Sequence, residues 1–254
     1  MRLKDKVAIV TGGSSGIGEQ ISLRFGQEGA KVAVVNRTAE AGEKVAKEII
    51  AAGGTAKAFP CDVSDKGEVQ AMVQGVVDAF GTVDILIGNA GFMVLKPLEE
   101  LSEEDWDRTL DVNVKGNFLL AQAVAPIMKK KHYGKIVLTG SIAGSQGHGE
   151  GAAYCASKGG VILLMKALTS ELAKEGINVN CFSPGATATP LNAEYRADPE
   201  ILALFARNTP TGRDYIPPQD LAGAALFLAS DDAHAVHGQN LVVDDGFSAV
   251  KPVG

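Results

Sequence analysis

The chain has 254 residues, 46% of them hydrophobic and 21% charged, which suits one α/β domain over residues 1–254 with a well-filled core. A formal net charge of -6 argues against nucleic acid as a partner. No apolar run reaches the length of about 18 residues expected of a membrane span, and the first predicted strand begins at Val7, too early for a secretion signal. Three cysteines without a pairing or metal-binding pattern complete the expectation of a cytoplasmic protein.

Short apolar runs rich in β-branched residues alternate with helical patterns along the chain. This alternation predicts a parallel sheet covered on both faces by helices. Right-handed crossovers and a glycine-rich loop after the first strand favour a doubly wound, Rossmann-like sheet with its site at the carboxyl ends of the strands. The seven predicted strands span 7–10, 32–35, 55–59, 85–87, 136–138, 177–182 and 241–243.

The loop after the first strand has the sequence Thr-Gly-Gly-Ser-Ser-Gly-Ile-Gly over 11–18 and leads into a helical pattern. Its glycines suit a tight turn, an approach of the backbone to a diphosphate, and close packing of helix against strand. A glycine loop alone also fits a plain turn, but the strand before it and the helix after it are the context of a dinucleotide site. The predicted phosphate contacts are Gly12, Ser14, Ser15, Gly16, Ile17 and Gly18.

The second predicted strand ends at Asn36 and Arg37, where dinucleotide-binding folds select their cofactor. An acidic residue here would bind the adenosine ribose and repel a 2′-phosphate, whereas a neutral residue with a nearby arginine accommodates that phosphate. The pair therefore favours NADP, with NAD as the alternative. On the plainer interpretation, Arg37 only ends a strand at the surface.

Tyr154 and Lys158 stand four residues apart where a helical pattern begins, and Ser141 precedes the tyrosine by thirteen residues. Side chains four apart share one face of a helix, so the ammonium favours the phenolate, and the helix dipole acts in the same direction. We expect the pKa of Tyr154 to fall; activity near neutrality requires a drop of roughly 3 units, or roughly 4 kcal/mol. Alone, such a pair also occurs on solvated helix faces.

Further motifs accompany this pair in a definite order. The full set comprises the loop 11–18, Asn89-Ala90-Gly91, Asn113, Ser141, Tyr154 and Lys158. In order and spacing, over nearly the whole chain, it resembles the short-chain dehydrogenase/reductase family, of the 3-oxoacyl-carrier-protein reductase and sugar or polyol dehydrogenase type. The resemblance implies an NAD(P)-dependent enzyme that interconverts a ketone and a secondary alcohol. An inactive dinucleotide-binding sensor or scaffold is the alternative from another class.

The resemblance also implies a role for each catalytic residue. Tyr154 would be the general acid and base, and Ser141 would hydrogen-bond the same substrate oxygen. Lys158 would bind the nicotinamide ribose and lower the pKa of Tyr154. Asn113 would help to hold a water that links Lys158 to solvent, although it could equally be a residue at a helix kink.

The remaining cofactor contacts are likewise implied by the family. Asp62 and Val63 match the position at the adenine ring, and Asn89, Ala90 and Gly91 match the position at the adenosine ribose. The segment at the nicotinamide carboxamide comprises Pro184, Gly185, Thr187 and Thr189. Taken singly, Asp62 could only cap a turn and Pro184 could only form a loop. Two positions depart from the usual family pattern: Gly88 replaces an asparagine, and Asp245 stands where a glycine is usual, at some cost if its φ is positive.

Two regions are expected to face the substrate. The first is the glycine-rich run between Ser141 and Tyr154, with Gln146, His148 and Glu150, faced by Phe92 and Met93. The second is 190–215, which we name the lid segment, with apolar side chains Leu191, Ile201, Leu202, Leu204 and Phe205. The polar loop suits a polyol or sugar acid, and the apolar lid segment equally suits an acyl chain.

Assembly and metal binding have weaker signals. The helical patterns at 118–128 and 161–172 are apolar nearly all round. A helix that covers one face of a sheet needs only one apolar stripe, so these helices have more apolar surface than that contact requires. The family pairs these helices across a dimer interface and often forms tetramers, so we expect a homo-oligomer, with a deeply covered monomer as the alternative. His234 and His237 near Asp231 and Asp232 have poor spacing for a metal site, and no metal is predicted.

Overall fold

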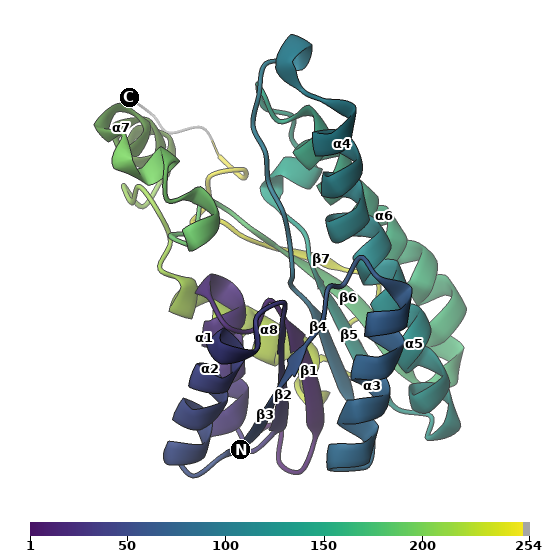
Figure 1. Cartoon of the computed structure of the whole chain (residues 1–254). Helices are drawn as coiled ribbons and strands as arrows, with labels where there is room; N and C mark the ends of the chain where they lie inside the picture. Colours follow the sequence, from purple (N-terminus) through teal and green to yellow (C-terminus); the bar gives the residue numbers. More distant parts are fainter. Residues whose placement is uncertain (251–254) are drawn as a thin grey trace.

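A computed structural model describes residues 1–250 of the protein. Its centre is one sheet of seven parallel strands in the order β3-β2-β1-β4-β5-β6-β7 (Figure 1), which confirms the predicted doubly wound fold. All seven predicted strands are present, each longer than predicted by one to three residues. Their bounds are β1 Val7–Thr11, β2 Lys31–Asn36, β3 Thr55–Pro60, β4 Ile85–Gly88, β5 Gly134–Thr139, β6 Ile177–Pro184 and β7 Asn240–Val243.

Helices cover both faces of the sheet (Figure 1). One face packs against α1 (Gly16–Gln27), α2 (Ala39–Ala51) and α8 (Pro218–Ala229). The other packs against α3 (Lys66–Phe80), α5 (Gly116–Lys130) and α6 (Ala152–Leu172), and α4 (Glu103–Leu110) lies against α6. No helix within residues 1–250 combines the length and apolar character needed to cross a bilayer.

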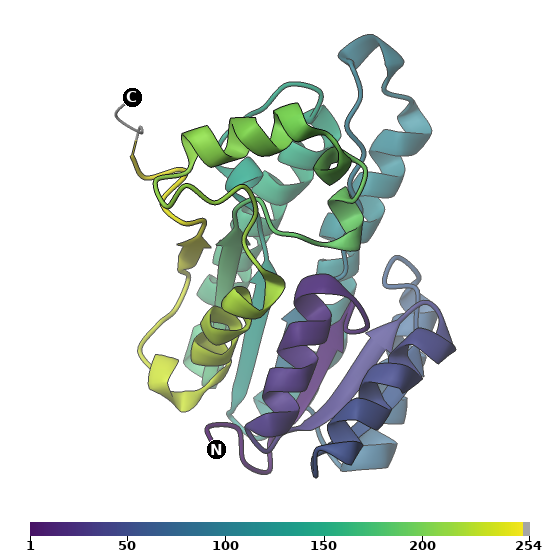
Figure 2. The same cartoon turned by 90° about the vertical axis from the view of Figure 1, so that its left-hand side faces the viewer.

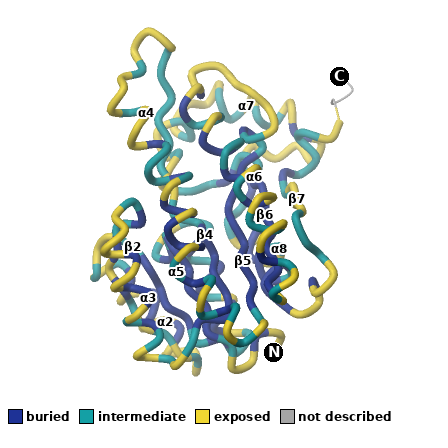
Figure 3. The backbone as a smooth tube through the Cα atoms, turned by 90° about the vertical axis from the view of Figure 1, so that its right-hand side faces the viewer, coloured by how far each residue is buried: buried dark blue, intermediate teal, exposed yellow. Residues whose placement is uncertain are grey.

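Strand alternation divides the apolar residues between two cores. In β1 and β4, Ile9 pairs with Leu86 and both face the α3–α5–α6 side, whereas Val10 pairs with Ile87 and both face the α1–α8 side. Successive side chains of a strand point to opposite faces, so a strand covered on both sides is apolar throughout. Figure 3 shows the central strands β4, β5 and β6 as buried and the exposed residues mainly in loops and on the outer helix surfaces.

The carboxyl ends of the strands carry the longest connections. The stretch between β6 and α8 holds α7 (Pro199–Asn208), which lies across the top of the molecule in Figure 2. Asp198 caps this helix by accepting a hydrogen bond from the amide of Glu200 at 2.8 Å. Helix α1, by contrast, begins after Ser15 without any side-chain cap, so the amides of its first turn have no side-chain partner there.

Helix α1 packs closely against the end of β1 at Gly18. A Cβ placed on Gly18 would lie 2.1 Å from the carbonyl oxygen of Gly12 and 2.6 Å from Nδ2 of Asn89. Any side chain at this position would push α1 away from the end of β1. The glycine therefore fixes where the uncapped helix end lies relative to the sheet edge.

Replacing this glycine gives a direct test. Gly18→Ala should destabilise the protein by about 3 kcal/mol in urea unfolding, because a methyl group cannot enter the contact without a backbone shift. Gly223→Ala is the matched control: Gly223 is also helical, in α8, and a Cβ there meets nothing within 4 Å. The control should be neutral or more stable by about 0.5–1 kcal/mol. Equal stability of the two variants would contradict the tight packing.

Candidate active site

Two adjoining cavities open at the carboxyl edge of the sheet. One has a volume of about 810 Å³ and the other of about 900 Å³, and Gly12, Ser15, Ala90 and Gly91 border both. We name them the catalytic cavity, which contains Tyr154, and the adenosine cavity, which lies over the end of β2. A trough of this size across the middle of a doubly wound sheet suits a dinucleotide.

The glycine loop has the geometry expected for a diphosphate site. Gly12 and Gly16 have φ angles of 61° and 54°, in the left-handed region that only glycine adopts freely. A Cβ on Gly16 would lie 3.0 Å from Cγ2 of Thr189, so the loop and the segment after β6 face each other closely. Together with the uncapped end of α1, these residues fit an anion held by backbone amides.

Thr11 organises the neighbouring turn, a role that the sequence did not suggest. Its buried hydroxyl accepts hydrogen bonds from the amides of Asn89 at 2.9 Å and Ala90 at 3.1 Å. The amide side chain of Asn89 donates to the carbonyl of Thr11 at 3.0 Å. The threonine thereby ties the Asn89-Ala90-Gly91 turn, placed by the family at the adenosine ribose, to the glycine loop.

The adenosine cavity collects the residues predicted for the far half of the cofactor. Arg37 is exposed at its rim, and the Asn36 amide donates to the carbonyl of Thr38 while its Oδ1 is buried without a partner. Asp62 accepts hydrogen bonds from the hydroxyl and the amide of Ser64, and these lower the pKa of its carboxyl group. Ser14 and Val63 line the same cavity.

Phe92 differs from its predicted place. It lines the adenosine cavity rather than the substrate region, and the guanidinium of Arg108 from α4 lies 4.3 Å from its ring centroid. Arg108 is a second arginine at this cavity, which the sequence did not single out because it lies far along the chain from Arg37. Met93, the next residue, does line the catalytic cavity.

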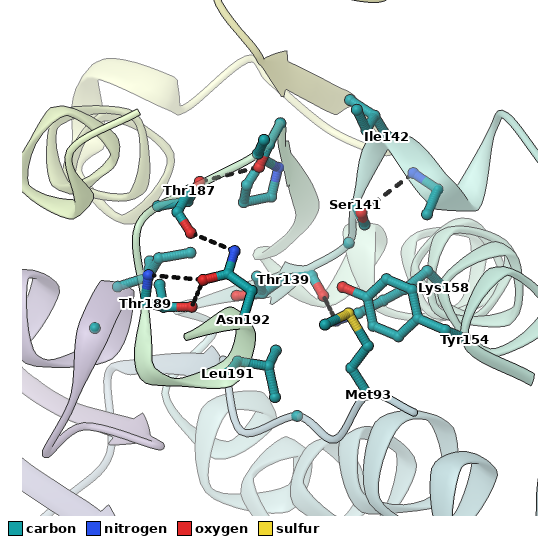
Figure 4. A pocket seen from close by; sticks show the side chains of 18 of the residues that line it. Met93, Thr139, Ser141, Ile142, Tyr154, Lys158, Thr187, Thr189, Leu191 and Asn192 are labelled. Carbon is teal, nitrogen blue, oxygen red and sulfur yellow. Dashed lines mark hydrogen bonds between the residues drawn. The ribbon is translucent and has the colours of Figure 1, made fainter. Parts of the chain in front are cut away.

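Ser141, Tyr154 and Lys158 meet in the catalytic cavity (Figure 4). Tyr154 lies in the first turn of α6, as expected, and Lys158 follows one turn later. The ammonium lies 5.8 Å from the tyrosine ring centroid and donates to the carbonyl of Thr139, at the end of β5, at 2.8 Å. Ser141 begins the turn after β5, and its hydroxyl accepts from the amide of Ala143 at 3.1 Å.

The pKa of Tyr154 moves opposite to the direction predicted from the sequence. Burial raises it by disfavouring the phenolate, and interaction with the Ser141 hydroxyl opposes this only in part. Burial also lowers the pKa of Lys158 to about 8. The prediction was wrong because it counted the nearby cation and the helix dipole but not desolvation, which acts against both charged forms.

Asn113 is fully buried within a π-helical turn, Asp111–Lys115, between α4 and α5. Its Oδ1 accepts from the amide of Phe92 at 2.8 Å, and its Nδ2 donates to the Phe92 carbonyl and to the hydroxyl of Ser157, both at 2.9 Å. These contacts occupy both amide hydrogens of the side chain, whereas its oxygen has a second lone pair. The role of Asn113 in holding a water, and its alternative as a residue at a helix kink, both stay predictions.

The segment after β6 borders the catalytic cavity through all four of its predicted residues, Pro184, Gly185, Thr187 and Thr189. On the opposite side, Gln146 and His148 also line this cavity. Glu150 does not; its φ is 61° and its carbonyl accepts from the amide of Lys96 at 2.9 Å. Within the lid segment, Leu191 and Phe205 line the cavity, whereas Ile201, Leu202 and Leu204 do not.

Known proteins resemble this chain along its length. A family profile described as enoyl-(acyl carrier protein) reductase matches residues 12–248. D-threitol dehydrogenase of Mycolicibacterium smegmatis is 41% identical over 247 residues, covering 97% of this chain and 94% of that protein.

Solved structures agree. A short-chain type dehydrogenase/reductase from Mycobacterium marinum, 35% identical, has a TM-score of 0.93 and covers 98% of this chain and 97% of its own. A gluconate 5-dehydrogenase from Burkholderia cenocepacia, in complex with NADP and tartrate, is 32% identical with a TM-score of 0.95 and the same coverage. The chain therefore belongs to the short-chain dehydrogenase/reductase family of oxidoreductases.

Proposed function

We propose that the protein interconverts a ketone and a secondary alcohol with a nicotinamide dinucleotide, NADPH preferred, and that Tyr154 is its general acid and base. The observation that carries this proposal is the convergence of Ser141, Tyr154 and Lys158 in one cavity beside the glycine loop. A binding protein without catalysis would not need this trio. The dinucleotide would supply or accept the hydride, and the protein positions the reactants and moves the proton.

The tyrosine is a proton donor in the resting site. Because burial raises its pKa, Tyr154 carries its proton at neutral pH. Ser141 accepts one hydrogen bond from the amide of Ala143, so its own hydroxyl proton is free to bind the same substrate oxygen. Both hydroxyls can then stabilise the charge that develops on that oxygen.

Lys158 supplies the matching positive charge. With a pKa of about 8 it is mostly protonated at pH 7, and its ammonium donates one hydrogen bond, to the Thr139 carbonyl. An ammonium has three donors, so two remain for the ribose of a bound dinucleotide. Its charge favours the phenolate that forms when Tyr154 gives up its proton.

Cofactor choice depends on the adenosine cavity. Arg37 at its rim, the absence of a carboxylate at Asn36, and Arg108 across the cavity support NADP. The solved relative with bound NADP agrees with this assignment. NAD is the second candidate, because Glu103, Glu104 and Asp107 line the same cavity and would repel a 2′-phosphate.

We further propose a homo-oligomer, a dimer or tetramer, in the cytoplasm. Leu163 of α6 is 66% exposed, Phe118 of α5 is 42% exposed and Trp106 of α4 is 37% exposed. Large apolar side chains on three neighbouring helices are typical of a subunit interface. Cys61, Cys155 and Cys181 are all free, which fits a reducing compartment.

Removing the tyrosine hydroxyl tests the catalytic proposal. Tyr154→Phe should lower kcat by at least about 100-fold, because general acid catalysis contributes that much, and should leave the cofactor Kd within about twofold. Tyr133→Phe is the control: its hydroxyl bonds Asp231 at 3.0 Å, outside both cavities, and kcat should not change. Activity of Tyr154→Phe within about tenfold of the parent would remove Tyr154 as the proton donor.

Cofactor kinetics test Arg37. Arg37→Ala should raise the KM for NADPH by about tenfold and leave the KM for NADH nearly unchanged, since only NADPH carries the 2′-phosphate. Arg24→Ala removes the same charge from the surface of α1 and should change neither value, because its ion pair with Glu28 is exposed. Equal losses for both cofactors in Arg37→Ala would contradict the phosphate contact.

The depressed pKa of Lys158 can be measured by NMR titration of protein labelled in its lysine side chains. The Lys158 resonance should titrate near pH 8, with ammonium below and neutral amine above that pH, because burial lowers the pKa of this amine from its ordinary value of 10.5. Lys158→Ala should remove that resonance and so assign it. A Lys158 signal that titrates at the ordinary value would show that burial does not act on this amine.

A further inference from the structure

We propose that the catalytic cavity takes an uncharged ketone or secondary alcohol with an apolar, ring-bearing body, and that polyols and sugar acids are poor substrates. This inference rests on the proposed function and adds the chemical class of the substrate. Three features of the cavity lead to it: its missing charges, its occupied polar groups and its aromatic wall.

The cavity has no site for a carboxylate. Among its lining residues, within the part of the chain that the structure describes, Lys158 is the only lysine or arginine, and there is no aspartate or glutamate. Lys158 donates to the Thr139 carbonyl, and its two remaining donors are those proposed above for the ribose of the dinucleotide. The guanidinium of Arg196, in the lid segment, is held instead by Oδ1 of Asn192 and the carbonyl of Thr189. A buried anion would remain unpaired.

The polar side chains of Asn192, in the lid segment, and of Thr187, just before it, bond to neighbouring backbone groups. Asn192 accepts from the amide of Thr189 at 3.1 Å and donates to the carbonyl of Thr187 at 2.8 Å. The hydroxyl of Thr187 donates to the carbonyl of Gly185 at 3.0 Å. The polar side chains that a polyol could still bind here include the exposed Gln146 and His148 and the hydroxyls of Tyr195 and Tyr215, which are few for a cavity of about 810 Å³.

An aromatic wall closes the other side of the cavity. Phe205 of α7 lies with its ring centroid 5.2 Å from that of Tyr215 and 6.0 Å from that of Phe247. Phe205 and Tyr215 belong to the lid segment and Phe247 to the C-terminal turn, and all three line the cavity, as do Leu191 and Met93. Tilted aromatic rings of this kind present flat apolar surface, which a ring or aromatic group of a ligand can cover.

The wall is held in place by the turn that follows β7. Asp244 accepts hydrogen bonds from the amides of Gly246 at 3.0 Å and Ser248 at 2.7 Å, on either side of Phe247. Asp245, with a φ of 54°, accepts from the hydroxyl of Thr211 in the lid segment at 3.2 Å. The C-terminal turn and the lid segment are therefore linked, so Phe247 and Phe205 keep their contact.

The tyrosines of this region are partly buried. Burial is the main cause that raises the pKa of both Tyr195 and Tyr215, and both line the cavity. Water that contacts such a surface is displaced favourably by an apolar ligand. The free energy of substrate binding would come mainly from that displacement.

Matched ketones test the proposal. With wild-type enzyme and each cofactor, benzylacetone and ethyl acetoacetate should be reduced with kcat/KM at least about 100-fold above acetoacetate, because only the last carries an unpaired carboxylate. Benzylacetone should exceed erythrulose, a polyhydroxy ketone, by at least about tenfold. Equal or higher kcat/KM for acetoacetate or erythrulose would overturn the substrate class and leave the oxidoreductase intact. No reduction of any of the four ketones would instead count against the proposed function itself.

Two variants locate the effect on the wall. Phe205→Ala and Phe247→Ala should each raise the KM for benzylacetone by about tenfold and leave the KM for NADPH and for ethyl acetoacetate within about twofold. Leu204→Ala is the matched control, since Leu204 adjoins Phe205 in α7 but is 49% exposed and lies outside the cavity. Unchanged KM for benzylacetone in both phenylalanine variants would overturn the aromatic contact.

Discussion

Burial of the Tyr154–Lys158 pair on one face of α6 is the constraint on which the site depends. Desolvation raises the pKa of the phenol and lowers that of the amine, so the resting protein disfavours both charged forms. The Thr139 carbonyl is the amine's protein partner. In the proposed mechanism, Lys158 is already charged at neutral pH, and the phenolate of Tyr154 forms only when reactants fill the cavity and their polar groups replace the lost water.

The position of that helix face depends on a buried asparagine. Asn113 joins the backbone of Phe92, at the adenosine cavity, to Ser157, the residue before Lys158. It can do so because the π-helical turn brings its side chain out of the regular α-helical spacing. Through these contacts, the single side chain of Asn113 links the adenosine cavity to the helix that carries Tyr154 and Lys158. We therefore infer that Asn113 is a positioning residue for the two cavities.

Local patterns predicted the fold correctly, and most of the predicted site residues line one of the two cavities. Strand periodicity, the glycine loop and the start of α6 depend on residues close in sequence, and all are present. The direction of the Tyr154 pKa shift and the side on which Phe92 lies were wrong, because both depend on packing between distant segments. Glu150 lies outside the cavity because the backbone turns at this residue, with a φ of 61°. Helical and strand periodicity in the sequence does not predict such a turn.

The C-terminal turn illustrates how a departure from a family pattern can carry information. A positive φ was expected to cost stability at Asp245, and its φ of 54° confirms the conformation. Glycine would adopt it with less strain but could not accept the hydrogen bond from Thr211. The side chain thus offsets part of the backbone cost by linking the turn to the lid segment. Because that link lies beside the aromatic wall and involves none of Ser141, Tyr154 and Lys158, substitutions there would, under the proposed function, alter substrate choice without disturbing proton transfer.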